Sequence, residues 1–136
     1  MTRPTPAALV LASVERLAAR FPRDALLPMW AVLDAHRTGS AELPALAARA
    51  LEESERLSRY ADASNECGPG FPRDDPGPWY WSGLASLTQA AGLASADPEL
   101  ALHHVDMAAY AVGYPTRDLQ EAERRWRAEQ QALSPA

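Results

Sequence analysis

Apolar residues in this chain recur at intervals of three and four, and proline and glycine interrupt them, which restricts the fold to packed helices. Val10, Val14, Leu17 and Phe21 form one such face, the pattern of an amphipathic helix. Residues 98–112 are apolar on nearly all sides, as is typical of a central, buried helix. No stretch of useful length alternates with a period of two. The sequence therefore predicts an all-α fold.

Start and stop signals divide the chain into about six helices, which we expect to form a single domain over residues 1–136, an irregular bundle around the fifth helix. Thr5 with Pro6, Asp24, and Asp97 with Pro98 have the composition of helix N-termini, and Gly39 that of a helix end. The expected helices begin near Thr5, Asp24, Ser40 or Leu43, Pro78, Asp97 and Thr116.

Charge and composition narrow the class of protein. The 136 residues carry 13 basic and 18 acidic side chains, a net charge of −5, and the basic residues are all arginine. This balance argues against nucleic acid as a partner, because such proteins present a clustered basic face. No apolar run is long enough to span a bilayer, and the N-terminus does not resemble a signal peptide. We expect a soluble cytoplasmic protein with no membrane partner, and no motif indicates a cofactor.

The segment from residue 62 to residue 78 is predicted to be a long loop between two helices. Long loops inside a compact domain are usually functional or disordered. This one is acidic and leads into Trp79, Tyr80 and Trp81. Two interpretations remain open: the rings pack into the core, or they form a binding patch with Phe71, surrounded by the acids Asp62, Glu66, Asp74 and Asp75.

Cys67, the only cysteine, lies in the same segment. A catalytic thiolate needs a nearby cation or histidine to lower its pKa, whereas the neighbouring groups here are acidic. We therefore interpret Cys67 as an incidental cysteine, with a catalytic nucleophile as the alternative. Gly68–Gly70 lacks the lysine and the spacing of a phosphate-binding loop and is interpreted as a turn.

His103, His104 and Asp106 are the one cluster that could bind a metal or transfer protons. Adjacent residues point about 100° apart on a helix, and a zinc site needs at least three protein ligands. His103, Asp106 and Tyr110 share a stripe. The alternative interpretation is therefore a core histidine held by the carboxylate and by Tyr110.

Several segments together resemble one of the all-helical immunity protein families of bacterial polymorphic toxin systems. They are Trp30–Gly39, the alanine-rich helix that follows it, Ala90–Ala94, His104–Val105 with Ala109–Ala111, and Glu123–Trp126. The resemblance spans roughly residues 24–133. It implies a cytoplasmic bacterial protein that binds and neutralises a cognate toxin domain, and it carries no established functional residues over to this chain.

The sequence thus favours a non-enzymatic binding protein of the immunity or inhibitor class, with a basic protein domain as partner. The predicted partner-binding residues are Asp62, Glu66, Phe71, Asp74, Asp75, Trp79, Tyr80, Glu52, Glu53 and Glu55. The alternative is a small metal- or ligand-binding enzyme centred on His103, His104 and Asp106, with the loop as a lid. A homo-oligomer that uses the aromatic patch on itself is a third possibility.

Overall fold

The computed structural model describes residues 4–67, 78–112 and 128 of the chain. These residues contain five α-helices, one short 3₁₀ helix and no strand, which confirms the all-α prediction. The sixth predicted helix, beginning at Thr116, lies outside the described residues. The elements are α1 (Pro6–Ala18), η1 (Arg23–Leu26), α2 (Leu27–Thr38), α3 (Leu43–Cys67), α4 (Pro78–Leu93) and α5 (Pro98–Val112).

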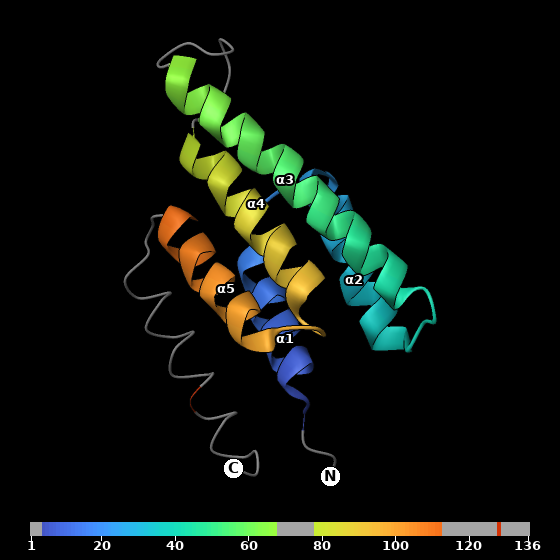
Figure 1. The fold of residues 1–136 in the computed structure, drawn as a ribbon. Coiled ribbons are helices and arrows are strands. Elements are labelled where there is room, and N and C mark those ends of the chain that lie inside the picture. Colours follow the sequence, from blue (N-terminus) through green and yellow to red (C-terminus); the bar gives the residue numbers. More distant parts are fainter. Residues whose placement is uncertain (1–3, 68–77, 113–127, 129–136) are drawn as a thin grey trace.

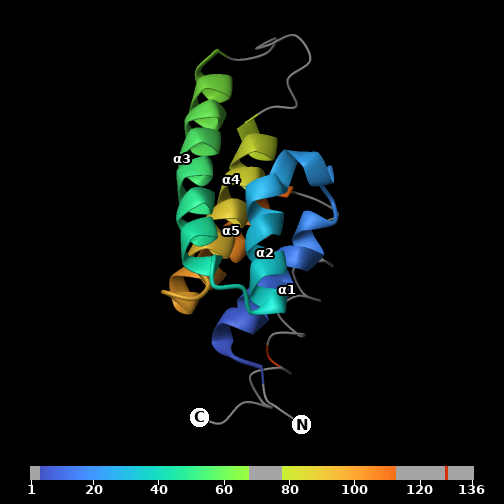
Figure 2. The ribbon, with the colours of Figure 1, turned by 90° about the vertical axis from the view of Figure 1, so that its right-hand side faces the viewer.

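The helices form two layers, with α3, α4 and α5 side by side in one layer and α1 and α2 behind them (Figures 1 and 2). The middle helix, α4, packs against every other helix, and most extensively against α3 and α5. In the described part of the chain, α3 and α5 have almost no contact with each other. The two outer helices of the front layer are therefore held together through α4.

The prediction that the fifth helix is the centre of the bundle is wrong, because α4 occupies that position. On α5, Leu100 and Met107 are 42% and 46% exposed, and Tyr110 is 69% exposed. Small residues explain why α4 can be surrounded instead. A Cβ atom added at Gly92 would lie 2.8 Å from Leu51 Cγ and 3.0 Å from the Ala47 carbonyl oxygen, so glycine permits the close approach of α3.

The core lies between the two layers. Its largest fully buried side chains come from α1, η1, α2, α4 and α5, and each buried Leu, Val or Met contributes roughly 1.5–3 kcal/mol relative to exposure. They include Val10, Val14, Leu17, Leu26, Met29, Val32, Leu84, Leu87 and Val105. The predicted apolar face of the first helix is thus confirmed, with Phe21 packed at its edge.

Three predicted helix ends are confirmed by their hydrogen bonds. The Ala8 amide donates to Thr5 Oγ1 at 3.1 Å, and the Leu100 amide donates to Asp97 Oδ1 at 3.1 Å; caps of this kind are worth about 1 kcal/mol each. Gly39 has a φ of 67°. The following amide, of Ser40, donates back to the Ala35 carbonyl at 2.9 Å, the arrangement that ends a helix on a left-handed residue.

Two predicted boundaries are wrong. Asp24 does not cap the second helix: it lies in η1, and α2 begins only at Leu27. Pro28 explains the interruption, because proline has no N–H to donate to the carbonyl four residues earlier. The predicted loop does not begin at Asp62, since α3 continues to Cys67. Residues 62–67 contain no proline or glycine to end the helix.

None of the described helices contains an apolar stretch long enough to cross a bilayer.

Candidate functional site

A pocket of about 440 Å³ lies over α4, between α3 and α5. We call it the α3–α5 groove. Its base is formed by Ser82, Ala85, Ser86 and Gln89 of α4. Its two sides are Ser54 and Ser58 of α3, and His103, His104, Asp106, Met107, Tyr110 and Ala111 of α5. The volume falls within the range of roughly 300–1,000 Å³ that is common for ligand sites.

Helical spacing places these side chains in the groove. Ser82, Ser86 and Gln89 follow one another at intervals of four and three, so they share one face of α4. The opposite face carries Leu84 and Leu87, which are fully buried in the core. Because α4 packs one face against the core and lines a groove with the other, the residues on its groove side can be small or polar, and Ser86 among them is itself buried.

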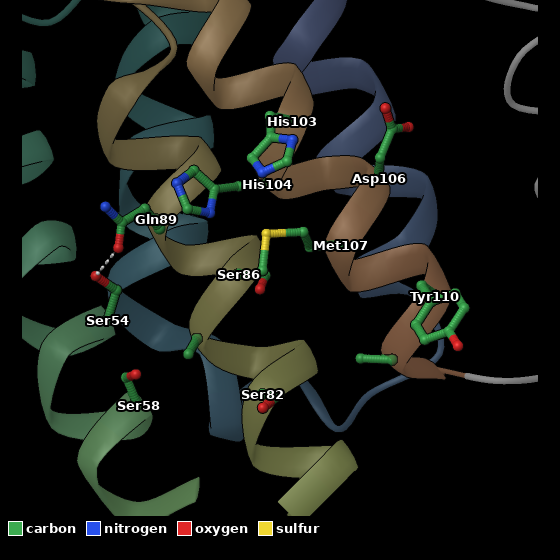
Figure 3. A pocket seen from close by; sticks show the side chains of 12 residues that line it. Ser54, Ser58, Ser82, Ser86, Gln89, His103, His104, Asp106, Met107 and Tyr110 are labelled. Carbon is green, nitrogen blue, oxygen red and sulfur yellow. Dashed lines mark hydrogen bonds between the residues drawn. The ribbon is translucent and has the colours of Figure 1, made fainter. Parts of the chain in front are cut away.

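One hydrogen-bonded pair joins the two sides of the base. The Ser54 hydroxyl donates to Gln89 Oε1 at 2.9 Å (Figure 3). Its oxygen also lies 2.7 Å from the Leu51 carbonyl oxygen. Ser54 is 1% exposed. It is the polar residue in the otherwise apolar face of α3, and its hydrogen bond to Gln89 of α4 explains why a hydroxyl can be buried there.

The side chains of α5 divide between the groove and its outer edge. Figure 3 shows His104 and Met107 pointing from α5 over α4, toward Gln89 and Ser86, whereas Asp106 and Tyr110 project from the other side of α5. The spacing of His104 and Met107 by three residues explains their shared direction. His103 is exposed on the outer side, and the two imidazole rings meet edge to face with centroids 5.8 Å apart.

The prediction of a core histidine is wrong, because His103 is exposed and His104 is only half-buried. Partial burial lowers the pKa of His104, and the nearby charge of His103 lowers it further. Both causes disfavour the imidazolium form. The imidazole that faces the groove is therefore neutral at neutral pH and offers one acceptor and one donor nitrogen.

The three residues of the predicted cluster do line one pocket. Among the described residues, however, no three His, Cys, Asp or Glu side chains come together as a metal site would require. The groove supplies hydroxyl, amide and imidazole groups, and these can bind a ligand through hydrogen bonds.

The predicted acidic and aromatic surface is only partly described. Phe71, Asp74 and Asp75 lie outside the described residues, and so do the side chains of Glu66 and Trp79.

On α3, Glu52, Glu55 and Asp62 are exposed, while Glu53 is half-buried and ion-paired with Arg56. Arg49 and Arg59 are also exposed on this helix. The outer face of α3 is consequently mixed in charge. Acidic and arginine side chains lie next to one another on it, so it is not a purely acidic surface.

Tyr80 belongs to a chain of ring contacts rather than to an exposed patch. Its ring meets Phe21 edge to face with centroids 5.4 Å apart, and Trp81 at 5.3 Å. Trp81 continues the chain to Tyr60 of α3 at 4.5 Å. Burial raises the pKa of Tyr80, with a smaller contribution from the charge of Asp24. Tyr80 thus packs against the core, where such ring pairs are worth about 0.5–1.5 kcal/mol each.

The comparisons with known proteins leave the site to be interpreted from its own geometry. Neither the known protein families, nor the curated proteins, nor the solved structures include a significant match to this chain.

Proposed function

We propose that this protein is a non-enzymatic binding protein of the immunity or inhibitor class, and that it holds a segment of its protein partner in the α3–α5 groove. The observation that carries the proposal is the groove itself: an open depression of about 440 Å³ whose base is formed mostly by small side chains and which offers several hydroxyl groups. Small residues let an incoming chain approach the α4 backbone closely. The hydroxyl and amide groups can satisfy the partner's polar groups.

Charge supports a basic partner. The whole chain has a net charge of −5, which accelerates the approach of a positively charged protein. Glu55 and Asp62 are exposed on α3. They lie three and four residues from Ser58, on the same side of the helix. Within the described part of the chain, neither carboxylate has an ion-pair partner.

The test is a pull-down with the product of the neighbouring gene, using a groove-filling variant. In Ser86→Trp, an indole occupies the base of the groove, and we expect binding to fall at least tenfold. Ala48→Trp is the matched control, since Ala48 is exposed on α3 outside the groove lining. If a folded Ser86→Trp protein binds as tightly as the unaltered one, the groove is not the binding site.

The predicted loop surface needs its own variant. Asp74→Arg combined with Asp75→Arg reverses two charges that lie outside the described residues. We expect weaker binding if these acids contribute to recognition. Binding that is lost in Ser86→Trp but unchanged in the double variant would confine recognition to the groove.

A second candidate is a small-molecule enzyme, and one observation favours it: His103, His104 and Asp106 line the same pocket. A neutral histidine can act as a general base near neutral pH. A panel of chromogenic ester and phosphoester substrates provides the measurement. Turnover that is abolished in His104→Ala, with partner binding intact, would support this function over the first.

A further inference from the structure

We propose that an exposed stripe of α5 is the docking site of the chain's own C-terminal segment, residues 116–133, which packs antiparallel to α5 as a sixth helix. The inference goes beyond the proposed function, since it concerns how the chain covers its own surface. Four observations carry it: the exposed apolar side chains of α5, the apolar pattern of the segment, the short connection between the two, and the exposure of Ala128.

The exposed apolar side chains are concentrated on α5. Of the four large hydrophobic side chains that are exposed in the described part of the chain, three belong to this helix: Leu100 at 42%, Met107 at 46% and Tyr110 at 69%. Single exposed apolar residues are ordinary, whereas a group of them on one surface marks a contact site. Among the described elements, only α4 and α1 pack substantially against α5, and they leave these side chains exposed.

The spacing of these residues is that of a helix–helix contact. Four exposed residues follow one another at intervals of three, four and three, and so lie along one side of α5: Leu100, His103, Met107 and Tyr110. We call them the α5 stripe. Alternating intervals of three and four are the repeat by which one helix packs along another. The α5 stripe therefore fits a helix that runs alongside α5 over most of its length.

The segment that follows α5 carries a matching pattern in its sequence. Its apolar residues recur at intervals of three, four and seven, which places them on one side of a helix: Leu119, Ala122, Trp126 and Leu133. The connection, residues 113–115, reads Gly-Tyr-Pro, and links of about two to five residues join antiparallel helix pairs. Residues 116–133 are long enough to run back along the whole of α5 (Pro98–Val112).

Ala128 is the one residue of the segment that the structure describes, and it is helical and exposed. On a helix it lies about 200° from Trp126, so it belongs to the side opposite the apolar one. A docked segment turns its apolar side toward α5 and its opposite side toward solvent. The exposure of Ala128 agrees with that orientation.

The experiment is disulfide trapping in the full chain with Cys67→Ser. Counting equally in both directions from the connection places Ala122 opposite Met107. The pair Met107→Cys with Ala122→Cys should therefore form a disulfide within one chain, which requires Cα atoms within about 7 Å of each other. The matched control is Met107→Cys with Ala132→Cys, which moves the second cysteine about 15 Å along the segment. The measurement is the rate of oxidation in dilute protein, followed by mass spectrometry.

We expect the first pair to close at least about tenfold faster than the control pair, because docking fixes the register. A segment that does not dock would give a ratio of only about two, because loop closure depends weakly on loop length. Trp126→Ser removes the largest apolar side chain of the segment and should slow the first pair at least about fivefold. Arg127→Ser, about 100° away on the helix, should change the rate less than about twofold.

A ratio near two would overturn the inference, since it describes an undocked segment. Disulfides that join two chains would overturn it as well, because the α5 stripe would then contact a second copy of the protein. An unchanged rate in Trp126→Ser would likewise contradict docking through the apolar side. The Ser86→Trp test of the proposed function stands or falls separately from all three results.

Discussion

The two faces of α4 differ in what they pack against, and the difference explains why one helix can be both the centre of the fold and the base of a site. The face toward α1 and α2 carries Leu84 and Leu87, both fully buried. The opposite face carries Ser82, Ser86 and Gln89, which line the groove. Stability should therefore depend on the first face and binding on the second.

The largest expected effect tests this division directly. Leu84→Ala should lower the free energy of unfolding by about 2–5 kcal/mol, because it removes buried methyl groups and leaves a cavity. Ser86→Ala, two residues along on the other face, should change it by less than about 1 kcal/mol. Urea denaturation measures both. A Ser86→Ala cost as large as that of Leu84→Ala would show that the groove face is part of the core.

The next largest expected effect concerns the side of α4 that packs against α3. Gly92→Ala brings a Cβ atom to 2.8 Å from Leu51 Cγ and 3.0 Å from a backbone oxygen of Ala47. Overpacking of this kind costs about 1–3 kcal/mol, of which the better helix propensity of alanine returns roughly 1 kcal/mol.

Gly83→Ala is the matched control, on the same helix. Its new Cβ would lie 3.2 Å from Phe21 Cζ, the outer end of a movable ring. We expect a thermal midpoint close to that of the unaltered protein. If Gly92→Ala is equally harmless, α3 is not held at close range by this glycine.

The sequence predicted the helical class and several helix ends well, because these depend on local chemistry. Thr5, Gly39 and Asp97 carry their capping signals within four residues of the bonds they form. The central position of α4 could not be predicted in the same way. It depends on how closely other helices approach, and Gly92 acquires its meaning only from Leu51 and Ala47.

The groove was visible in the sequence only as small irregularities. Ser54 interrupts an apolar face, and Ser82, Ser86 and Gln89 form a polar stripe on a mostly apolar helix. The cluster of His103, His104 and Asp106 was identified from residue type, but a core position was expected for it. Whether these residues are buried or exposed depends on how much of α5 the other helices cover, and this tertiary packing cannot be inferred from local sequence.

A smaller effect is expected for the bond across the base of the groove. Ser54→Ala removes the hydroxyl that donates to Gln89 at 2.9 Å and should cost about 0.5–1.5 kcal/mol. Ser58→Ala is the control, since Ser58 also lines the groove but is exposed. Equal and negligible costs in chemical denaturation would mean that the Ser54 bond does not help to join α3 to α4.

The smallest effect is a pH dependence. The pKa of His104 is lower in the folded protein than the ordinary value of about 6.5, because of burial and of His103. The unfolded chain therefore binds the proton more readily, and stability falls as the pH decreases from about 7 through the lowered folded pKa. The change should be below about 1 kcal/mol, since the imidazole is half-exposed and solvent screens it.

His104→Gln should flatten this part of the stability profile, measured by urea denaturation between pH 7.5 and pH 5. His103→Gln should raise the pKa of His104, measured by NMR titration, because it removes one of the two causes. An unchanged profile in His104→Gln would assign the acid sensitivity to other groups.

The near absence of contact between α3 and α5 in the described part of the chain has a consequence for local opening. Each of these helices can detach from α4 without disturbing the other, so the free energy of local opening can differ along the front layer. A segment bound in the groove would contact both helices at once and make their opening cooperative. Amide hydrogen exchange in α3 and α5 would then slow together on binding, which links occupancy of the groove to the rigidity of the whole layer.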